Sequence, residues 1–303
     1  LQPDHEETEQ FCRDVCAELS VPIIVERISV PVGTGQAGGL EDAARNARYR
    51  VFRHLQQPGD LLLMAHHADD QLETVLFRLL RGSGVGGLAG MPRTRSLGKG
   101  RLLRPWLAVG RERLEQVAAG AGLDWREDPS NQSQVHDRNY LRHAVVPGLK
   151  QRWPGLLRRV AHSARACADS EYLNRKLAEL HWQACADGGH RVTLAGFRTL
   201  DRIEQRNLLC WRFRQNGWPL PSLADWDQVL TELLEAAEGG QPELRGPGYS
   251  VRRYREHLYF VPDAMTPAGD VFLEPDKPLR WGSWRITLAA CGAADTADAP
   301  VSP

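Results

Sequence analysis

Apolar and polar positions change their period several times along the first part of the chain. The segment Pro22–Val30 (PIIVERISV) is rich in β-branched residues and predicts a strand, which the glycine-rich residues 32–39 would follow as a loop. Helical spacing of apolar residues predicts one helix over Glu6–Leu19 and another over Glu41–Leu55. The chain is therefore expected to open with helix, strand and helix.

A second strand and helix follow directly. Residues 61–65 (LLLMA) form an unbroken apolar run, which is typical of a strand buried on both faces of a parallel sheet. Asp69–Arg81 predicts a helix that ends at Gly82, with an apolar stripe made of Leu72, Val75, Leu76, Leu79 and Leu80. Alternating strands and helices predict an α/β fold with a parallel sheet, in which ligands bind at the carboxyl ends of the strands. Four polar residues lie at that end of the LLLMA strand: His66, His67, Asp69 and Asp70.

The alternation of strands and helices stops after Pro154. Long helical patterns cover residues 156–183, 202–214 and 225–237, and strand-like alternation returns beyond Pro247. We therefore expect a nucleotide-binding domain over residues 1–152, a mainly helical domain over 153–263, and a linker or the start of a further domain over 264–303.

The charge of the chain is polarised, although its formal net charge is zero. Thr74–Arg111 and Arg138–Ala168 contain many arginines and no aspartate or glutamate, whereas acidic residues collect around residues 225–243. Basic faces of this kind attract phosphate backbones. Solvated arginines on an ordinary surface are the alternative.

Membrane and secreted classes are not favoured. No apolar run approaches the roughly 20 residues that span a bilayer, and no secretory signal opens the chain. Six scattered cysteines show no metal-site spacing. A cytoplasmic location, with no membrane partner, is expected.

Residues 65–91 (AHHADDQLETVLFRLLRGSGVGGLAGM) carry the strongest chemical signal. Asp70 and Glu73 lie three residues apart on one helix face, and carboxylates at a strand end suit Mg²⁺, which also binds substrate phosphates. His67 is a candidate for phosphate contact or proton transfer, and the following glycines permit backbone N–H groups to approach an anion. A capped helix followed by a turn is the structural alternative, but capping needs only one acid.

The same stretch, A-H-H-x-D-D-Q-x-E-T followed by R-G-S-G-x-x-G-L-x-G-M, resembles a signature of the tRNA(Ile)-lysidine synthetases, which are PP-loop ATP pyrophosphatases. Residues 39–52, 101–107 and 125–149 resemble three further stretches of that family in order and spacing, so the likeness covers most of residues 5–170. The resemblance implies an α/β nucleotide-binding fold. It also implies ATP-dependent ligation of L-lysine to C2 of the wobble cytidine of tRNA(Ile) with a CAU anticodon, through an adenylated intermediate.

The resemblance also implies site residues. The catalytic candidates are His67, Asp70 and Glu73, with Asp70 as a Mg²⁺ ligand. The candidates for binding ATP or another substrate are Glu41, Arg45, Arg48, Arg78, Arg81, Gly82 and Gly84. The candidates for binding tRNA are Arg104, Arg138, Asn139, Arg142, Arg158 and Arg159. The resemblance also implies that the mainly helical domain over residues 153–263 binds the tRNA, largely through shape and phosphate contacts. For Asp128, Asn131 and the residues that follow, a structural turn is an equal alternative.

The sequence departs from the family at one place. The family's Ser-Gly-Gly-x-Asp-Ser loop, which wraps the pyrophosphate of ATP, has no match, and residues 32–39 are no substitute. We therefore expect that this chain alone cannot adenylate cytidine, and that its catalytic domain is incomplete at the N-terminus. The sequence leaves open whether the protein is a homodimer.

Three rival interpretations remain at this point. One is another PP-loop enzyme such as a tRNA thiolase, although no cysteine lies near the motif. Another is a zinc-dependent hydrolase, because A-H-x-x-D-D faintly resembles the A-H-x-D-D of sugar de-N-acetylases. The third is a tRNA-binding module without catalysis.

Overall fold

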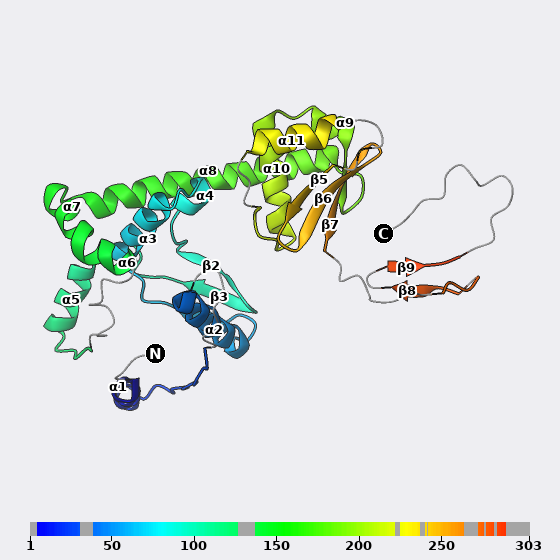
Figure 1. The fold of residues 1–303 in the computed structure, drawn as a ribbon. Helices are drawn as coiled ribbons and strands as arrows, with labels where there is room; N and C mark the ends of the chain where they lie inside the picture. The colour runs from blue at the N-terminus through cyan, green and yellow to red at the C-terminus, as the bar shows by residue number, and fades with distance from the viewer. Residues whose placement is uncertain are drawn as a thin grey trace. The chain divides into compact units, whose positions relative to one another are not determined.

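The chain divides into two compact units, Leu1–Tyr172 and Leu173–Pro303, and the division falls within one long helix, α8 (Leu156–Cys185). The computed structural model in Figure 1 describes residues 5–30, 39–126, 137–221, 225–236, 240, 242–263, 272–275, 277–281 and 284–288. Among the helices of these residues, none is both long enough and apolar enough to cross a membrane.

The first unit joins helices to a small sheet. Its elements in chain order are α1 (His5–Glu18), α2 (Gly39–Leu55), β1 (Leu61–Leu63), α3 (Ala68–Leu80), α4 (Val85–Leu88), β2 (Thr94–Leu97), β3 (Gly100–Leu103), α5 (Arg111–Gly120), α6 (Asp137–Tyr140), a π-helical turn η2 (Leu141–Val145), α7 (Val146–Arg152) and the first part of α8. The expected helices near residues 6–19, 41–55 and 69–81 are all present.

The sheet has the strand order β1-β3-β2, with β1 parallel to β3 and β2 antiparallel to it. Tyr49 of α2, Leu97 and Leu102 form a small buried core on this sheet. The expectation that the LLLMA strand is buried on both faces is wrong, since Leu61 and Leu63 are 53% and 60% exposed. Within the described residues β1 pairs only with β3, and no element covers that face.

The strand expected over Pro22–Val30 is not observed. Residues 21–30 have no regular secondary structure, and Ile24 and Ile28 are exposed. A β-branched run forms a strand only where a neighbouring strand supplies backbone partners and a packing surface. No described strand pairs with this segment.

Helix α3 buries its polar start rather than the whole of its apolar stripe. Leu72 is fully buried, but Leu79 and Leu80 at the other end of the stripe are exposed. The buried polar residues of the first two turns are Asp69, Gln71 and Glu73. Buried polar groups of this kind need partners, so α3 is held by hydrogen bonds and ion pairs as well as by apolar packing.

The second unit combines helices with an antiparallel sheet. It contains the end of α8, β4 (Arg191–Thr193), α9 (Leu194–Arg198), α10 (Arg202–Gln215), α11 (Trp226–Glu235), β5 (Glu243–Gly246), β6 (Tyr249–Tyr254), β7 (His257–Pro262) and a two-stranded ribbon of β8 (Leu279–Trp281) and β9 (Trp284–Ile286). The four-stranded sheet has the order β4-β7-β6-β5. The expected helical region is therefore present, and the strands expected beyond Pro247 belong to a sheet that contributes to the core.

One face of that sheet packs against α10 and α11 (Figure 1). Asp201 caps α10 through a capping box with Glu204, and Asp225 caps α11. The shared core is built from residues of the helices and of the strands, among them Leu208, Phe213, Leu230, Val251, Leu258 and Phe260.

The loop after α4 provides a test of stability. Gly90 has φ +66°, and a Cβ atom built there would lie 2.6 Å from Nε2 of Gln71, whose side-chain amide makes two hydrogen bonds to the backbone of Met91. We expect Gly90→Ala to lower the free energy of unfolding by about 2–3 kcal/mol, because it adds left-handed strain and disturbs these hydrogen bonds. Urea unfolding would measure the loss.

The matched control is Gly122→Ala. Gly122 has φ +64°, but nothing lies within 4 Å of its built Cβ, so only the strain of about 1 kcal/mol is expected. Equal losses in the two variants would contradict the role given to Gln71.

Candidate active site

The amino end of α3 follows the carboxyl end of β1 and is closed by His67. The His67 side chain accepts a hydrogen bond from the Asp70 amide at 3.4 Å, and the His67 amide donates to Oδ2 of Asp70 at 3.0 Å. This reciprocal arrangement is a capping box. The capping residue is thus His67, with Asp70 as its partner in the box, and Asp69 and Oδ1 of Asp70 remain available for contacts with other elements.

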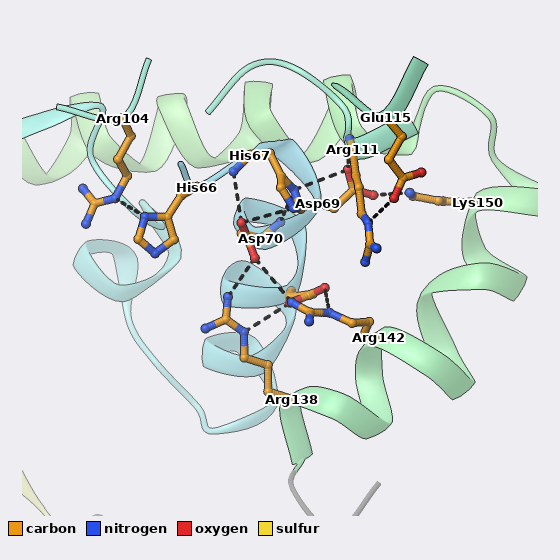
Figure 2. Close-up of polar contacts among 11 residues, drawn as sticks. His66, His67, Asp69, Asp70, Arg104, Arg111, Glu115, Arg138, Arg142 and Lys150 are labelled. Atoms are coloured by element: carbon orange, nitrogen blue, oxygen red, sulfur yellow. Dashed lines mark hydrogen bonds and ion pairs between the residues drawn. The ribbon is translucent and has the colours of Figure 1, made fainter. Parts of the chain in front are cut away.

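Two arginines face the carboxylates of α3 from α6 and η2, as Figure 2 shows. Arg142 makes a bidentate pair with Glu73, with Nε and Nη2 at 2.7 and 2.8 Å from the two carboxylate oxygens. Arg138 donates from Nε to Glu73 at 3.2 Å and from Nη2 to Oδ1 of Asp70 at 3.3 Å. The hydrogen bonds to Glu73 raise the pKa of Arg142 above its usual value.

The buried cluster joins segments that are far apart in the sequence. Glu73 is only 2% exposed, so its charge is stabilised by these two guanidinium groups rather than by water. The sequence placed Asp70 and Glu73 in a catalytic group and Arg138 and Arg142 in a tRNA-binding group. The structure brings all four together.

Asp69 contacts two further elements. Its Oδ2 accepts a hydrogen bond from the Arg111 amide at 2.8 Å, at the start of α5, and its Oδ1 pairs with Lys150 of α7. Burial alone would raise the pKa of Asp69, but the Arg111 amide and the Lys150 ammonium outweigh it and hold the pKa below its usual value. Asp69 is therefore an ionised group that positions α3, α5 and α7.

A cavity of about 290 Å³ opens beside these carboxylates. Its wall carries acidic groups, basic groups and an apolar patch made of Val146 and Pro147. The remaining lining residues are His67, Asp69, Glu73, Arg111, Arg142, His143 and Lys150. A cavity with both signs of charge and an aliphatic wall suits a small zwitterionic ligand with an apolar stem.

A second basic group lies around Arg104 and Tyr49. Arg104 is 2% exposed; its Nε donates to Nδ1 of His66 at 3.3 Å and its Nη1 to the Pro92 carbonyl at 2.8 Å. Burial and then the nearby Arg104 charge lower the pKa of His66 to about 4, so its ring is neutral and accepts this hydrogen bond at neutral pH. The guanidinium carbons of Arg45 and Arg95 each lie 5.1 Å from the Tyr49 ring centroid.

Arg104 has no acidic partner among the described residues of this second group. None of the hydrogen bonds and ion pairs of Arg104 within the described residues involves a carboxylate. A buried guanidinium group without a counterion is a favourable place for an anion.

The glycine-rich turn after α3 is held by hydrogen bonds from Arg78. Arg78 donates from Nη1 to the carbonyls of Gly87 and Gly90 at 2.9 and 2.8 Å. Gly82 has φ +72°, and Gly84 is the residue before α4. Arg81 lies at the end of α3 with its guanidinium carbon 4.1 Å from the Phe77 ring centroid, outside the carboxylate cluster.

Other candidates lie apart from these two groups. Arg48 is exposed on α2, and Arg158 and Arg159 are exposed on α8. Asn139 is half-buried on α6. The side chain of Glu41, the turn that contains Asp128 and Asn131, and the glycine-rich residues 32–38 lie outside the described parts of the chain.

Lys150, Arg111 and Arg95 were missed as site residues. Each belongs to a stretch that contains basic residues and no acid, and that was the only signal in the sequence. A charge pattern cannot show which basic side chain turns towards a particular carboxylate, because that depends on how α5 and α7 are placed.

Two family models match the chain. One, described as a PP-loop domain, matches residues 1–149, and the other, described as the TilS substrate binding domain, matches residues 193–259. A tRNA(Ile)-lysidine synthase of Alkalilimnicola ehrlichii is 42% identical over 267 residues, which are 88% of this chain and 59% of the relative. The chain belongs to the tRNA(Ile)-lysidine synthase family. This membership confirms the resemblance and the α/β nucleotide-binding fold.

Further members of the family agree. The tRNA(Ile)-lysidine synthase of Pseudomonas aeruginosa is 39% identical over 292 residues, which are 91% of this chain and 64% of that protein. The one of Coxiella burnetii is 36% identical over 259 residues, which are 86% of this chain and 57% of that protein. The chain thus spans about 60% of the length of these relatives.

The rival interpretations are not favoured. The two family models that match the chain are a PP-loop domain and a TilS substrate binding domain, and neither is described as a hydrolase. The described residues hold no group of three or more histidine, cysteine, aspartate or glutamate side chains arranged to bind a metal. The relatives reported above are lysidine synthases and not thiolases.

The ion pair of Asp69 with Lys150, and its hydrogen bond from the first amide of α5, predict a pH-dependent contribution to stability. At pH 7 we expect Asp69→Asn to lower the free energy of unfolding by about 2 kcal/mol, because a buried charged acceptor is lost. The folded-state pKa lies below the unfolded value, so this difference is fully present above about pH 4 and disappears as the pH falls through the folded-state pKa. Urea unfolding of both proteins over a pH series would measure it.

Glu115→Gln serves as the control. Glu115 pairs with Arg111 on the surface of α5, with a half-exposed side chain, and its loss should change stability by less than about 1 kcal/mol. A difference for Asp69→Asn that stays constant from pH 7 to pH 3 would contradict an ionised, paired Asp69.

Proposed function

We propose that the protein containing this chain is an ATP-dependent ligase that joins L-lysine to C2 of the wobble cytidine of tRNA(Ile) with a CAU anticodon, forming lysidine in the cytoplasm. In this reaction the cytidine is adenylated with release of pyrophosphate, and the lysine amine then displaces AMP. ATP supplies the leaving group, and the chain's own residues bind and orient the reactants.

One observation carries the proposal. Asp70 and Glu73 lie at the carboxyl end of β1 with a cation network around them, beside a cavity of about 290 Å³. The chain carries this arrangement within the region that a PP-loop family model matches. Ligands bind at the carboxyl ends of strands in such sheets.

Lysine fits the cavity by its chemistry. Glu73 and Asp69 place carboxylates in the cavity wall, where the ammonium group of lysine would join Arg142 and Lys150, the cations that already pair with them. Val146 and Pro147 offer an apolar wall to the aliphatic stem. Arg142 and Lys150 offer positive charge to the α-carboxylate. We propose that Asp70 acts in the same site by holding Arg138 and Arg142 in place. His67, as the cap of α3, orients Asp70.

Phosphate groups fit the second basic group. Arg104 is a buried cation without a carboxylate partner among the described residues, and Arg45 and Arg95 lie at the ring of Tyr49, which interacts with Arg104. We propose that these arginines receive phosphates of ATP or of the tRNA backbone, since preorganised guanidinium groups stabilise phosphate charge. The exposed residues proposed to meet the tRNA are Arg48, Arg158 and Arg159.

The assignment of Mg²⁺ to Asp70 is not favoured by the donor set. Oδ1 of Asp70 faces Arg138 and Arg142, and Oδ2 accepts from the His67 amide. A dication at Asp70 would meet two guanidinium groups within 3.4 Å of the same carboxylate. The Asp70 carboxylate is therefore suited to holding these two arginines and not to binding Mg²⁺.

The role of the carboxylates is tested by separating the two half-reactions in the gene product that contains this chain. We expect Glu73→Gln and Asp70→Asn to lower lysine transfer to tRNA(Ile) and raise the KM for lysine by about 10- to 100-fold, since a charged hydrogen-bond partner is lost. ATP–pyrophosphate exchange in the presence of tRNA should change by only a few-fold. Radiolabelled lysine incorporation and exchange assays measure the two steps.

Folding is checked in the same samples by circular dichroism, because Glu73→Gln leaves buried guanidinium groups with a weaker partner. Asp70→Asn is the milder variant, since the Asp70 side chain is more exposed than that of Glu73. Glu115→Gln is the surface control and should keep both activities. Unchanged lysine transfer in folded Asp70→Asn and Glu73→Gln would overturn the assignment, and zinc-dependent hydrolysis by the gene product would overturn the function.

A further inference from the structure

The four-stranded sheet of the second unit has two chemically different faces. Side chains along a strand point alternately to opposite faces, and Leu244, Val251 and Phe260 are buried on the face that packs against the helices. The alternate positions form the outer face, and they carry basic and aromatic residues: Arg245, Arg252, Tyr254, Tyr259 and Arg191. Aromatic residues and arginines are enriched at interfaces relative to the rest of a protein surface.

A pocket of about 410 Å³ lies at the β5–β6 end of this sheet. Its described lining residues are Pro242, Glu243, Arg245, Arg252, Arg253 and Tyr254, with Glu243 as the only carboxylate among them. Glu243 pairs with both Arg245 and Arg252, the latter at 3.2 Å, so a single negative charge faces two arginines. The pocket therefore keeps a net positive charge.

One arginine of this pocket makes structural hydrogen bonds, and two others have exposed side chains. Arg253 donates from Nη1 to the carbonyls of Leu234 and Ala236 at 3.0 and 3.2 Å, which ties β6 to the end of α11. The side chains of Arg245 and Arg252 are 77% and 56% exposed. They can meet a phosphate without losing a structural contact in the core.

Tyr254 supplies an aromatic surface beside these arginines. It is 58% exposed, its ring centroid lies 6.4 Å from that of Tyr259 in an edge-on arrangement, and the Arg255 guanidinium carbon is 5.4 Å from its ring centroid. Tyr259 is flanked in turn by Arg191 at 5.9 Å. Exposed aromatic rings interleaved with arginines on a sheet are how proteins stack unpaired RNA bases and neutralise the adjoining phosphates.

We propose that this outer face binds an unpaired nucleotide of an RNA, with its base stacked on Tyr254 and its flanking phosphates held by Arg245 and Arg252. The identity of that RNA as tRNA rests on the proposed function. The face belongs to the second unit, whereas the carboxylates of α3 belong to the first.

Binding of the 303-residue chain to labelled tRNA(Ile) transcript, measured by fluorescence polarisation over a salt series, tests the proposal. We expect Tyr254→Ala to weaken binding about tenfold and Tyr254→Phe to leave it unchanged, because stacking needs the ring and not the hydroxyl group. Arg245→Gln and Arg252→Gln should each lower the slope of log affinity against log salt by about one. Arg206→Gln changes an exposed arginine of α10 and is the matched control. Its affinity and its salt slope should change less than those of the other variants.

Each contrary result has a defined meaning. Affinity and salt slope that stay at the wild-type level in all three loss variants would overturn the proposal, while lysidine formation by the gene product would leave the proposed function standing. Weaker binding in the arginine variants with no change in Tyr254→Ala would overturn base stacking. An equal loss in Arg206→Gln would overturn a localised site, and circular dichroism of each variant excludes unfolding as the cause.

Discussion

The burial of the Glu73 carboxylate is the constraint on which the candidate site depends. A carboxylate that is almost completely removed from water needs polar partners inside the protein, and the guanidinium groups of Arg138 and Arg142 provide them. Because these arginines come from α6 and η2, the charge balance of α3 also fixes where those segments lie against it. The site and the local fold of the first unit are therefore products of the same electrostatic requirement.

Arginine serves several purposes in this chain, and the structure separates them by what each guanidinium group meets. Arg78 and Arg253 bind backbone carbonyls and hold a turn and a strand in place. Arg138 and Arg142 neutralise carboxylates. Arg104 is buried with His66, the Pro92 carbonyl and Tyr49 as its partners, and none of these is a carboxylate. Net charge alone, which is zero, conveys none of this division.

The sequence predicted the elements that carry a local signal. The helices at α2, α3, α8, α10 and α11 follow from periodicity, and the motif residues from their resemblance to a family. The strand expected over residues 22–30 failed because strand formation depends on partners that local composition does not reveal, and the exposed Leu61 and Leu63 show the same dependence for burial. The pairing of Arg138 and Arg142 with α3 was also out of reach, since it joins residues 65 to 72 positions apart.

Asp69 links the positions of three helices. It belongs to α3, caps the first amide of α5 and holds Lys150 of α7, so these three helices share a common anchor point. Any shift of one of them must either carry the other two along or break a contact to the same carboxylate. The walls of the adjoining cavity, which include both Arg111 and Lys150, are consequently coupled in position, and a ligand that presses on one wall also bears on the other.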